Sequence, residues 1–201
     1  MTKNNIIITK KTWETLSQRQ TELEQLIIQK RNSGSEINSI TPPLIWVSCF
    51  NVKRLKLCLL VEVGEFANEI KSFKAWHKKP EIDWAKAKEE LIDCLCFFLG
   101  LVGIYQIDMD PILTVEYKIK DLSFNELLLN FFAKTNDLYI EEDEQFYSLK
   151  NGKINEQAKN TYYGWLRTFE TVCRKLKINE LELVDIYSKK YDKNLERVNA
   201  K

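Results

Sequence analysis

Two carboxylates inside an apolar stretch are the residues with the clearest chemical potential. Residues 91–101 are almost entirely apolar, so a helix over them would be buried around nearly its whole circumference. Asp93 lies within this stretch, and Glu90 lies one turn earlier on the same face. A buried carboxylate must be protonated, paired with a cation or bound to metal, and a divalent ion serves two carboxylates better than one Lys or Arg. Gly100, two turns further along that face, leaves room for a ligand or a close helix.

A second acidic pair lies on the preceding amphipathic stretch. Its apolar positions share one arc at helical spacing and predict the core face: Leu59, Val63, Phe66, Ile70 and Phe73. An acidic stripe runs beside them, consisting of Glu62, Glu65 and Glu69. If Glu62-x-x-Glu65 faces Glu90-x-x-Asp93, four carboxylates with a formal charge near −4 surround one cavity. Two or three Mg²⁺ ions holding a di- or triphosphate suit such a site, and a structural salt-bridge cluster is the alternative.

Long helices must position these carboxylates. The expected helices are about 11–31, a second starting before Trp46 or by Lys53 and running to about Trp76, a third from Trp84 to about Tyr105 with Asp83 as N-cap, one from Ser123 through Tyr139, and two over about 155–176 and 179–199. Loops are expected at 32–43 and around Asn151-Gly152, and 114–120 is expected to be irregular. The sequence therefore predicts an all-α multi-helix bundle with a central pair of carboxylate-bearing helices, in a single domain over 1–201 with an insertion-like segment at about 105–160.

Composition excludes several classes of protein. The 201 residues carry a net charge of only +1, so no overall field draws the chain to nucleic acid or an anionic membrane. The single histidine, His77, excludes a multi-histidine zinc site. The five cysteines are odd in number and lack CxxC spacing, which favours a reducing cytoplasm. The longest apolar run, 94–105, falls well short of the roughly 20 residues that cross a bilayer, so we expect a buried helix.

Several motifs together resemble the all-α, dimeric dUTPases of the MazG-like nucleoside triphosphate pyrophosphohydrolases. The family signature is ExxE followed by ExxD, and here the matching segments are Val61 to Glu69, Phe73-Lys74-Ala75-Trp76 and Glu89 to Leu95. Near the C-terminus, Lys190-x-x-x-Asn194-x-x-Arg197 is similar to the segment with which these enzymes close over substrate. Gln20-x-x-Leu23 resembles their first helix, whereas about 105–160 has no match.

The resemblance implies an activity and a set of site residues. It implies a homodimer that hydrolyses dUTP, and dUDP, to dUMP, with a small-molecule nucleotide as its partner. The implied Mg²⁺ ligands are Glu62, Glu65, Glu90 and Asp93, and one of the first pair also orients or deprotonates the attacking water. The implied substrate contacts are Lys190 and Arg197 to phosphate, Asn194 to deoxyribose or phosphate, Gln20 and Trp76 in the uracil pocket, and Lys74 beside Trp76.

Cys96 departs from the family pattern. Many members have His three residues after the ExxD aspartate, whereas this sequence reads Asp93-Cys94-Leu95-Cys96-Phe97. Because a thiol is a weak hydrogen-bond donor, either the nucleoside contact is made elsewhere or selectivity is relaxed. Two alternatives therefore stay open: a related pyrophosphohydrolase with another base preference, such as dCTP, and a non-catalytic helical binding protein.

Overall fold

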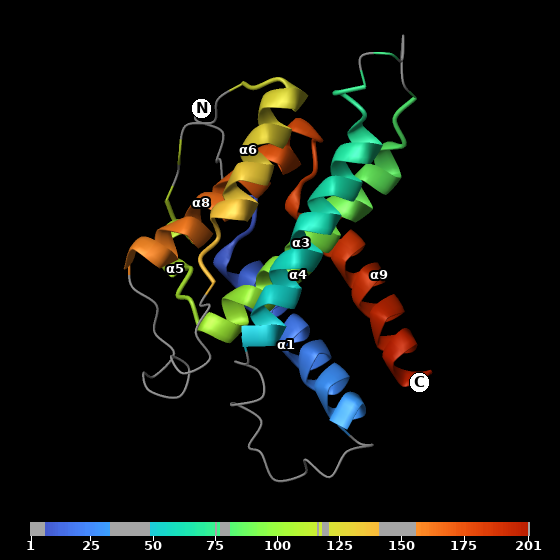
Figure 1. The fold of residues 1–201 in the computed structure, drawn as a ribbon, viewed down its shortest axis with the longest axis vertical. Helices are drawn as coiled ribbons and strands as arrows, with labels where there is room; N and C mark the ends of the chain where they lie inside the picture. The colour runs from blue at the N-terminus through green and yellow to red at the C-terminus, as the bar shows by residue number, and fades with distance from the viewer. Residues whose placement is uncertain are drawn as a thin grey trace.

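All the regular elements in the part of the chain that the structure describes are helices. The structure, a computed structural model, describes residues 7–32, 49–74, 76, 81–115, 117, 121–140 and 156–200. The helices are α1 (Lys10–Asn32), α3 (Cys49–Ile70), α4 (Trp84–Tyr105), α5 (Asp110–Leu113), α6 (Phe124–Asp137), α8 (Glu156–Lys175) and α9 (Glu180–Asn199), shown in Figure 1. The predicted all-α multi-helix bundle is confirmed, while the division into domains stays a prediction. The expected loop at 32–43, the Asn151-Gly152 turn and His77 lie outside the described residues.

Helices α3 and α4 form the central pair of the bundle. They share the most extensive contact between any two described helices, and α4 also packs against α1 and α9 (Figure 1). On the other side, α6 packs against both α3 and α8. The predicted central pair of carboxylate-bearing helices is therefore present, with α1 and α9 lying over α4.

Local interactions define both ends of helix α4, and the one at its start was predicted from the sequence. The carboxylate of Asp83 accepts a hydrogen bond from the backbone N–H of Lys86 at 3.0 Å, which confirms the predicted N-cap. At the other end, Gln106 adopts a left-handed conformation with φ of 49° and stops the helix. Between these caps most side chains are buried, as the all-round apolar pattern predicts. No helix in the described ranges is apolar over enough length to cross a membrane.

The predicted end of the second helix is wrong. Helix α3 ends at Ile70 because Lys71 adopts a left-handed conformation with φ of 57°, and the Lys71 ammonium donates to the backbone carbonyl of Glu81 at 2.8 Å. Phe73 therefore lies beyond the helix and is 46% exposed, so its assignment to the core face is wrong. The remaining members of that face are buried, and they are Leu59, Val63, Phe66 and Ile70.

The later helices lie close to their predicted ranges. Ser123 and Glu126 form a capping box at the start of α6, which ends at Asp137 and not at Tyr139. Asn179 caps α9 by accepting from the backbone N–H of Glu182 at 2.9 Å. The one-turn helix α5 was not predicted, and among residues 114–120 those described belong to no helix or strand.

An aromatic stack ties α4 to α8. The Trp165 ring lies 4.0 Å from the Phe98 ring and 5.5 Å from the Phe169 ring, and each pair is within 14° of parallel. Trp165 is fully buried, and its Nε1–H donates to the Thr135 hydroxyl at 2.9 Å. The Thr135 hydroxyl in turn donates to the carbonyl of Phe131 at 2.8 Å. The bond from Trp165 to Thr135 satisfies the only polar atom that the indole brings into the core.

Replacing the hydroxyl of Thr135 tests this arrangement. In Thr135→Val the shape is kept but the buried indole N–H of Trp165 loses its acceptor, which should cost about 1 to 3 kcal/mol of unfolding free energy in urea titrations. Thr15→Val is the matched control, because the exposed Thr15 hydroxyl makes the same bond to a carbonyl four residues earlier. The control should change stability by no more than about 0.5 kcal/mol. Equal effects of the two substitutions would contradict the assignment.

Candidate active site

Helices α3 and α4 bring three carboxylates together. One carboxylate oxygen from each of Glu62, Glu65 and Glu90 lies within 4.8 Å of the other two. Asp93, one turn beyond Glu90, is only 8% exposed and forms an ion pair with Lys190 of α9. The four acidic residues that sequence analysis singled out thus lie at one place, three as a direct cluster and Asp93 through its lysine partner. Clustered carboxylate oxygens are the donor set that Mg²⁺ and other hard cations prefer, so the residues present fit such an ion.

Burial and mutual repulsion raise the proton affinity of this cluster. The pKa of Glu62 rises to about 7, first because the side chain is partly buried and then because Asp93, Glu65 and Glu90 are nearby. Burial also raises the pKa values of Glu90 and Asp93, while Lys190 opposes both shifts. The folded protein without metal therefore holds negative charge that its surroundings disfavour, and a cation bound there would relieve that repulsion.

The cluster opens into a cavity of about 450 Å³ between four helices. Its walls come from α1, α3, α4 and α9, and the lining residues are Gln20, Leu23, Glu24, Ile27, Glu62, Glu65, Glu90, Asp93, Cys96, Phe97, Lys190, Asn194, Arg197 and Val198. The cavity therefore collects the predicted residues of α1, α3, α4 and α9 at one place. On α9, the Arg197 guanidinium donates to the Asn194 side-chain oxygen at 3.3 Å.

Cys96 lines this cavity on the wall that α4 forms. The side chain is 8% exposed, and burial together with the charge of Asp93 raises the pKa of its thiol. A neutral thiol is a poor nucleophile and a weak hydrogen-bond donor. The position that the family commonly gives to His therefore supplies little polar recognition in this chain.

Lys74 and Trp76 do not line the cavity. The Lys74 ammonium lies 5.6 Å from the centre of the Phe73 ring, and Trp76 is 73% exposed. Both residues follow the end of α3 at Ile70, which separates them from the helical segment that carries Glu62 and Glu65. Their predicted roles in substrate binding stay predictions.

Sequence reasoning missed several residues that line the cavity. The most informative is Glu24, which is 9% exposed and accepts a hydrogen bond from the Gln20 amide at 3.1 Å. The missed apolar residues are Leu23, Ile27, Phe97 and Val198. The spacing of Gln20, Leu23, Glu24 and Ile27 at three and four residues places them on one face of α1 and is the pattern that could have indicated this wall.

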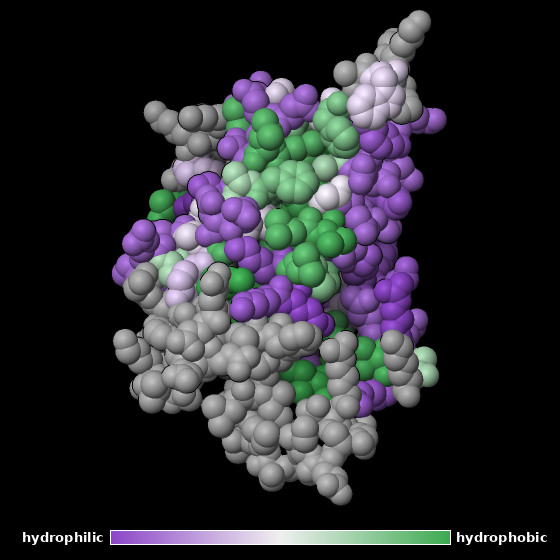
Figure 2. Space-filling model, in the orientation of Figure 1, coloured by the Kyte–Doolittle hydropathy of each residue, from purple (hydrophilic) through white to green (hydrophobic). Residues whose placement is uncertain are grey.

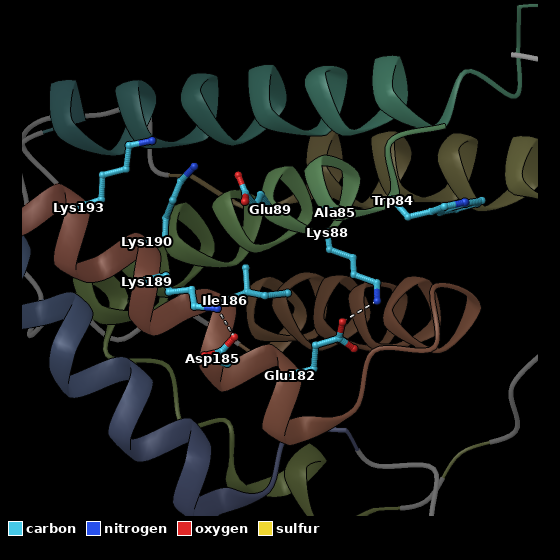
Figure 3. Close-up of a pocket in the computed structure, with 10 residues that line it drawn as sticks. All are labelled: Trp84, Ala85, Lys88, Glu89, Glu182, Asp185, Ile186, Lys189, Lys190 and Lys193. Carbon is cyan, nitrogen blue, oxygen red and sulfur yellow. Dashed lines mark hydrogen bonds and ion pairs between the residues drawn. The ribbon is translucent and has the colours of Figure 1, made fainter. Parts of the chain in front are cut away.

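A second hollow of about 420 Å³ lies between α4 and α9 and shares Lys190 with the first. Figure 3 shows that two of its lysines are engaged in ion pairs, Lys88 with Glu182 at 2.6 Å and Lys189 with Asp185 at 2.7 Å. Because its charges are largely matched within its own walls, this hollow lacks the excess of one sign that characterises the carboxylate cavity.

The fold and the site define an all-α protein in which carboxylates from two central helices meet a lysine across a nucleotide-sized cavity. This arrangement is typical of enzymes that hydrolyse phosphate chains. A family model described as dUTPase matches residues 12–201, so the chain belongs to this all-α dUTPase family and is a dUTP diphosphatase. No curated protein matches the chain. Membership of the wider MazG-like group stays a prediction.

The raised pKa of Glu62 predicts a pH-dependent effect of its replacement. Folding makes this carboxyl hold its proton up to about pH 7 instead of 4.5, so the wild type loses stability as the pH rises through that interval. Glu62→Gln mimics the protonated form. In EDTA above pH 7 the free energy of unfolding of Glu62→Gln should exceed that of the wild type by about 1 kcal/mol, after allowance for solvent screening. Near pH 4.5 the two proteins should be equally stable.

Urea unfolding in EDTA at both pH values measures this difference. Glu14→Gln on the exposed face of α1 serves as the control and should leave stability unchanged at either pH. A Glu62→Gln protein that is less stable than the wild type above pH 7 would contradict the repulsion in the cluster.

Proposed function

We propose that this chain uses Mg²⁺ to hydrolyse dUTP, and also dUDP, to dUMP. The observation that carries the proposal is the cluster in which oxygens of Glu62, Glu65 and Glu90 lie within 4.8 Å of one another, beside the buried Asp93 and its ion-pair partner Lys190. Dense negative charge of this kind is costly unless hard cations share it. The family assignment supplies the substrate class and favours an enzyme over the non-catalytic binding protein.

The four carboxylates would hold two or three Mg²⁺ ions. Bound Mg²⁺ supplies neutralisation of the phosphate oxygens as charge builds up on them. In our proposal one of Glu62 and Glu65 orients the attacking water and accepts its proton. Water oxygen then adds to a phosphorus atom as the bond to the leaving phosphate oxygen breaks. The products are dUMP with pyrophosphate from dUTP, and dUMP with phosphate from dUDP.

Residues of α9 would hold the phosphate chain. Lys190 already reaches the carboxylates from across the cavity, where Asp93 is its partner. An incoming phosphate offers the ammonium a second anion at the same place, so Lys190 would bind substrate with little movement of the helix. Arg197 lies further along the same wall and would bind phosphate oxygens, while its bond to Asn194 orients the amide towards sugar or phosphate.

Base selectivity is where a second candidate function has support. Cys96 lines the cavity as a buried thiol, and the Gln20 amide is already hydrogen-bonded to Glu24 and Tyr187. Hydrolysis of dCTP or another deoxynucleotide by the same chemistry is therefore the alternative. In the leading proposal Gln20, Cys96, Lys74 and Trp76 surround uracil, which requires the segment after α3 to approach the cavity when substrate binds.

A nucleotide panel tests the proposed chemistry. Wild-type protein with Mg²⁺ should release pyrophosphate from dUTP and phosphate from dUDP, and EDTA should abolish both activities. Glu65→Gln should lower turnover by about a hundredfold or more, because it removes a carboxylate of the cluster while the protein stays folded. Glu14→Gln should retain full turnover.

The other substrates in the panel are dCTP, dTTP and UTP. Preferential turnover of dCTP would keep the chemistry and establish the alternative base preference. A folded, Mg²⁺-loaded protein that hydrolyses none of the five nucleotides would contradict the proposal.

We also propose that the protein is a cytoplasmic homodimer. Cys58, Cys94, Cys96 and Cys173 are free thiols, which suits a reducing compartment. For the dimer, an apolar hollow of about 520 Å³ lies over α3 and α6 and is lined by Gly64, Ala67, Asn68, Phe73, Asn125, Leu128, Leu129 and Phe132. Figure 2 shows hydrophobic residues gathered on this face, and Leu129 is 71% exposed there. Exposed apolar surface of this kind favours burial against a second copy.

Leu129→Lys tests the dimer. A charged side chain on this face should convert the dimer to monomer, measured as a halved mass in light scattering coupled to gel filtration. Leu181→Lys is the control, because Leu181 is 83% exposed on α9 and away from the hollow. A wild-type protein that is monomeric at high concentration would contradict the proposal directly.

A further inference from the structure

Asp93 differs from the other three carboxylates of the site in its partner. Glu62, Glu65 and Glu90 each place an oxygen within 4.8 Å of the other two, whereas the Asp93 carboxylate forms an ion pair with the Lys190 ammonium. Only 11% of the Asp93 side chain and 20% of the Lys190 side chain are exposed, so salt and water screen this pair weakly. One of the four proposed metal ligands is therefore engaged by a cation that the chain itself supplies.

The Lys190 ammonium offsets negative charge across the whole site. Burial raises the pKa values of Glu62, Glu90 and Asp93, and the ammonium opposes all three shifts. Removal of Lys190 would leave the buried Asp93 carboxylate without its counter-charge, which is costly in a protein interior. Lys190 therefore does for the protein without metal what a hard cation does when it binds.

A lysine and a metal ion compete for the same carboxylate. The ammonium contacts Oδ2 of Asp93, and two cations that share one carboxylate repel each other. Mg²⁺ carries twice the charge of an ammonium and prefers carboxylate oxygens. A divalent ion that also binds the neighbouring glutamates therefore gains more from Asp93 than the single charge of Lys190 does.

Lys190 has a second place for its ammonium. The side chain lines both the carboxylate cavity and the hollow between α4 and α9, where Figure 3 also shows Glu89. The buried residues of α9 are Leu183 and Tyr187, which lie two turns and one turn before Lys190. Because the four-carbon stem of lysine is flexible, the ammonium can leave Asp93 while these two residues keep the helix in place.

We propose that Lys190 is an exchangeable counter-ion of the active site. Its ammonium neutralises Asp93 before metal binds and becomes available to the substrate phosphates when Asp93 becomes a metal ligand. Metal and phosphate then favour each other's binding, because each takes one partner from the Lys190–Asp93 pair and releases the other. The inference rests on the proposed function and deepens it by assigning the regulation of that site to one ion pair.

Lys190→Met tests the exchange through opposite effects on two ligands. In calorimetry on nucleotide-free protein, above the pKa of about 7 of Glu62, the Kd for Mg²⁺ should fall. We expect a decrease of about tenfold, because no ammonium competes for Asp93. At saturating Mg²⁺, the Kd for a dUTP analogue with an imido bridge between the α- and β-phosphates should rise about tenfold, since a phosphate contact is lost. A merely structural role of Lys190 would weaken the binding of both ligands.

Two variants control for the loss of a lysine from α9. Lys193 lies one turn further along the helix and lines the second hollow but not the carboxylate cavity. Lys193→Met should therefore leave both dissociation constants within about twofold of the wild type. Lys190→Arg keeps the positive charge beside Asp93 and should bind Mg²⁺ no more tightly than the wild type.

Lys190→Gln keeps the test decisive if Lys190→Met folds poorly. The glutamine amide can still donate to Asp93 but carries no charge, so it competes less with a metal ion. At the same Mg²⁺ concentration, the rise in Tm caused by Mg²⁺ should be larger for Lys190→Gln than for the wild type. An equal or smaller rise would contradict the exchange.

The outcomes separate this inference from the proposed function. Equal or weaker Mg²⁺ binding by Lys190→Met and Lys190→Gln, when the wild type hydrolyses dUTP, overturns the counter-ion role alone. A wild type that binds Mg²⁺ but hydrolyses no nucleotide overturns the proposed function, while the Mg²⁺ titrations still decide whether Lys190 competes with metal. A wild type and variants that bind no Mg²⁺ overturn both.

Discussion

The structure depends on the burial of one acidic helix face inside an otherwise apolar bundle. Helix α4 is covered by α1, α3 and α9, yet it carries Glu90 and the nearly inaccessible Asp93 on the face that these helices enclose. Desolvation penalises both charges, and Lys190 compensates Asp93. The same helix thus supplies the hydrophobic core on most of its surface and a concentrated negative charge on the remainder.

How far the sequence predicts the fold is clear from α3 and α4. Helix α4 was predictable because Asp83 is a strong cap and the following residues are apolar all round. The end of α3 was not, because nothing in the local sequence marks Lys71 as left-handed, and Lys is not a residue type that favours that conformation. The error also misplaced Phe73, which shows how one backbone angle redirects the side chains after it.

The candidate site divides in the same way. The carboxylates of α3 and α4 were predictable because a charged side chain within or beside an apolar helix face is costly to bury unless a cation accompanies it. Glu24 was not, because Gln20 with Glu24 has the same spacing as Gln18 with Glu22, and only packing against Gly100 and Tyr187 makes one pair buried and the other exposed. Residue types reveal a charge in an unfavourable place only when the neighbouring sequence is apolar, and α1 is amphipathic and rich in polar residues.

Helices far apart along the chain enclose the cavity, and this has a consequence for biosynthesis. Gln20 and Tyr187 are 167 positions apart, and Lys190 follows Tyr187 on the same helix. Closing so long a loop is entropically expensive, so α1 and α9 are expected to dock late in folding. As long as α9 is still inside the ribosomal exit tunnel, the emerged part of the chain has the acidic helices α3 and α4 but lacks the wall that carries Lys190. If Lys190 binds phosphate as proposed, activity requires α9 in place, and nucleotide bound in the completed cavity would stabilise the whole bundle against unfolding and proteolysis.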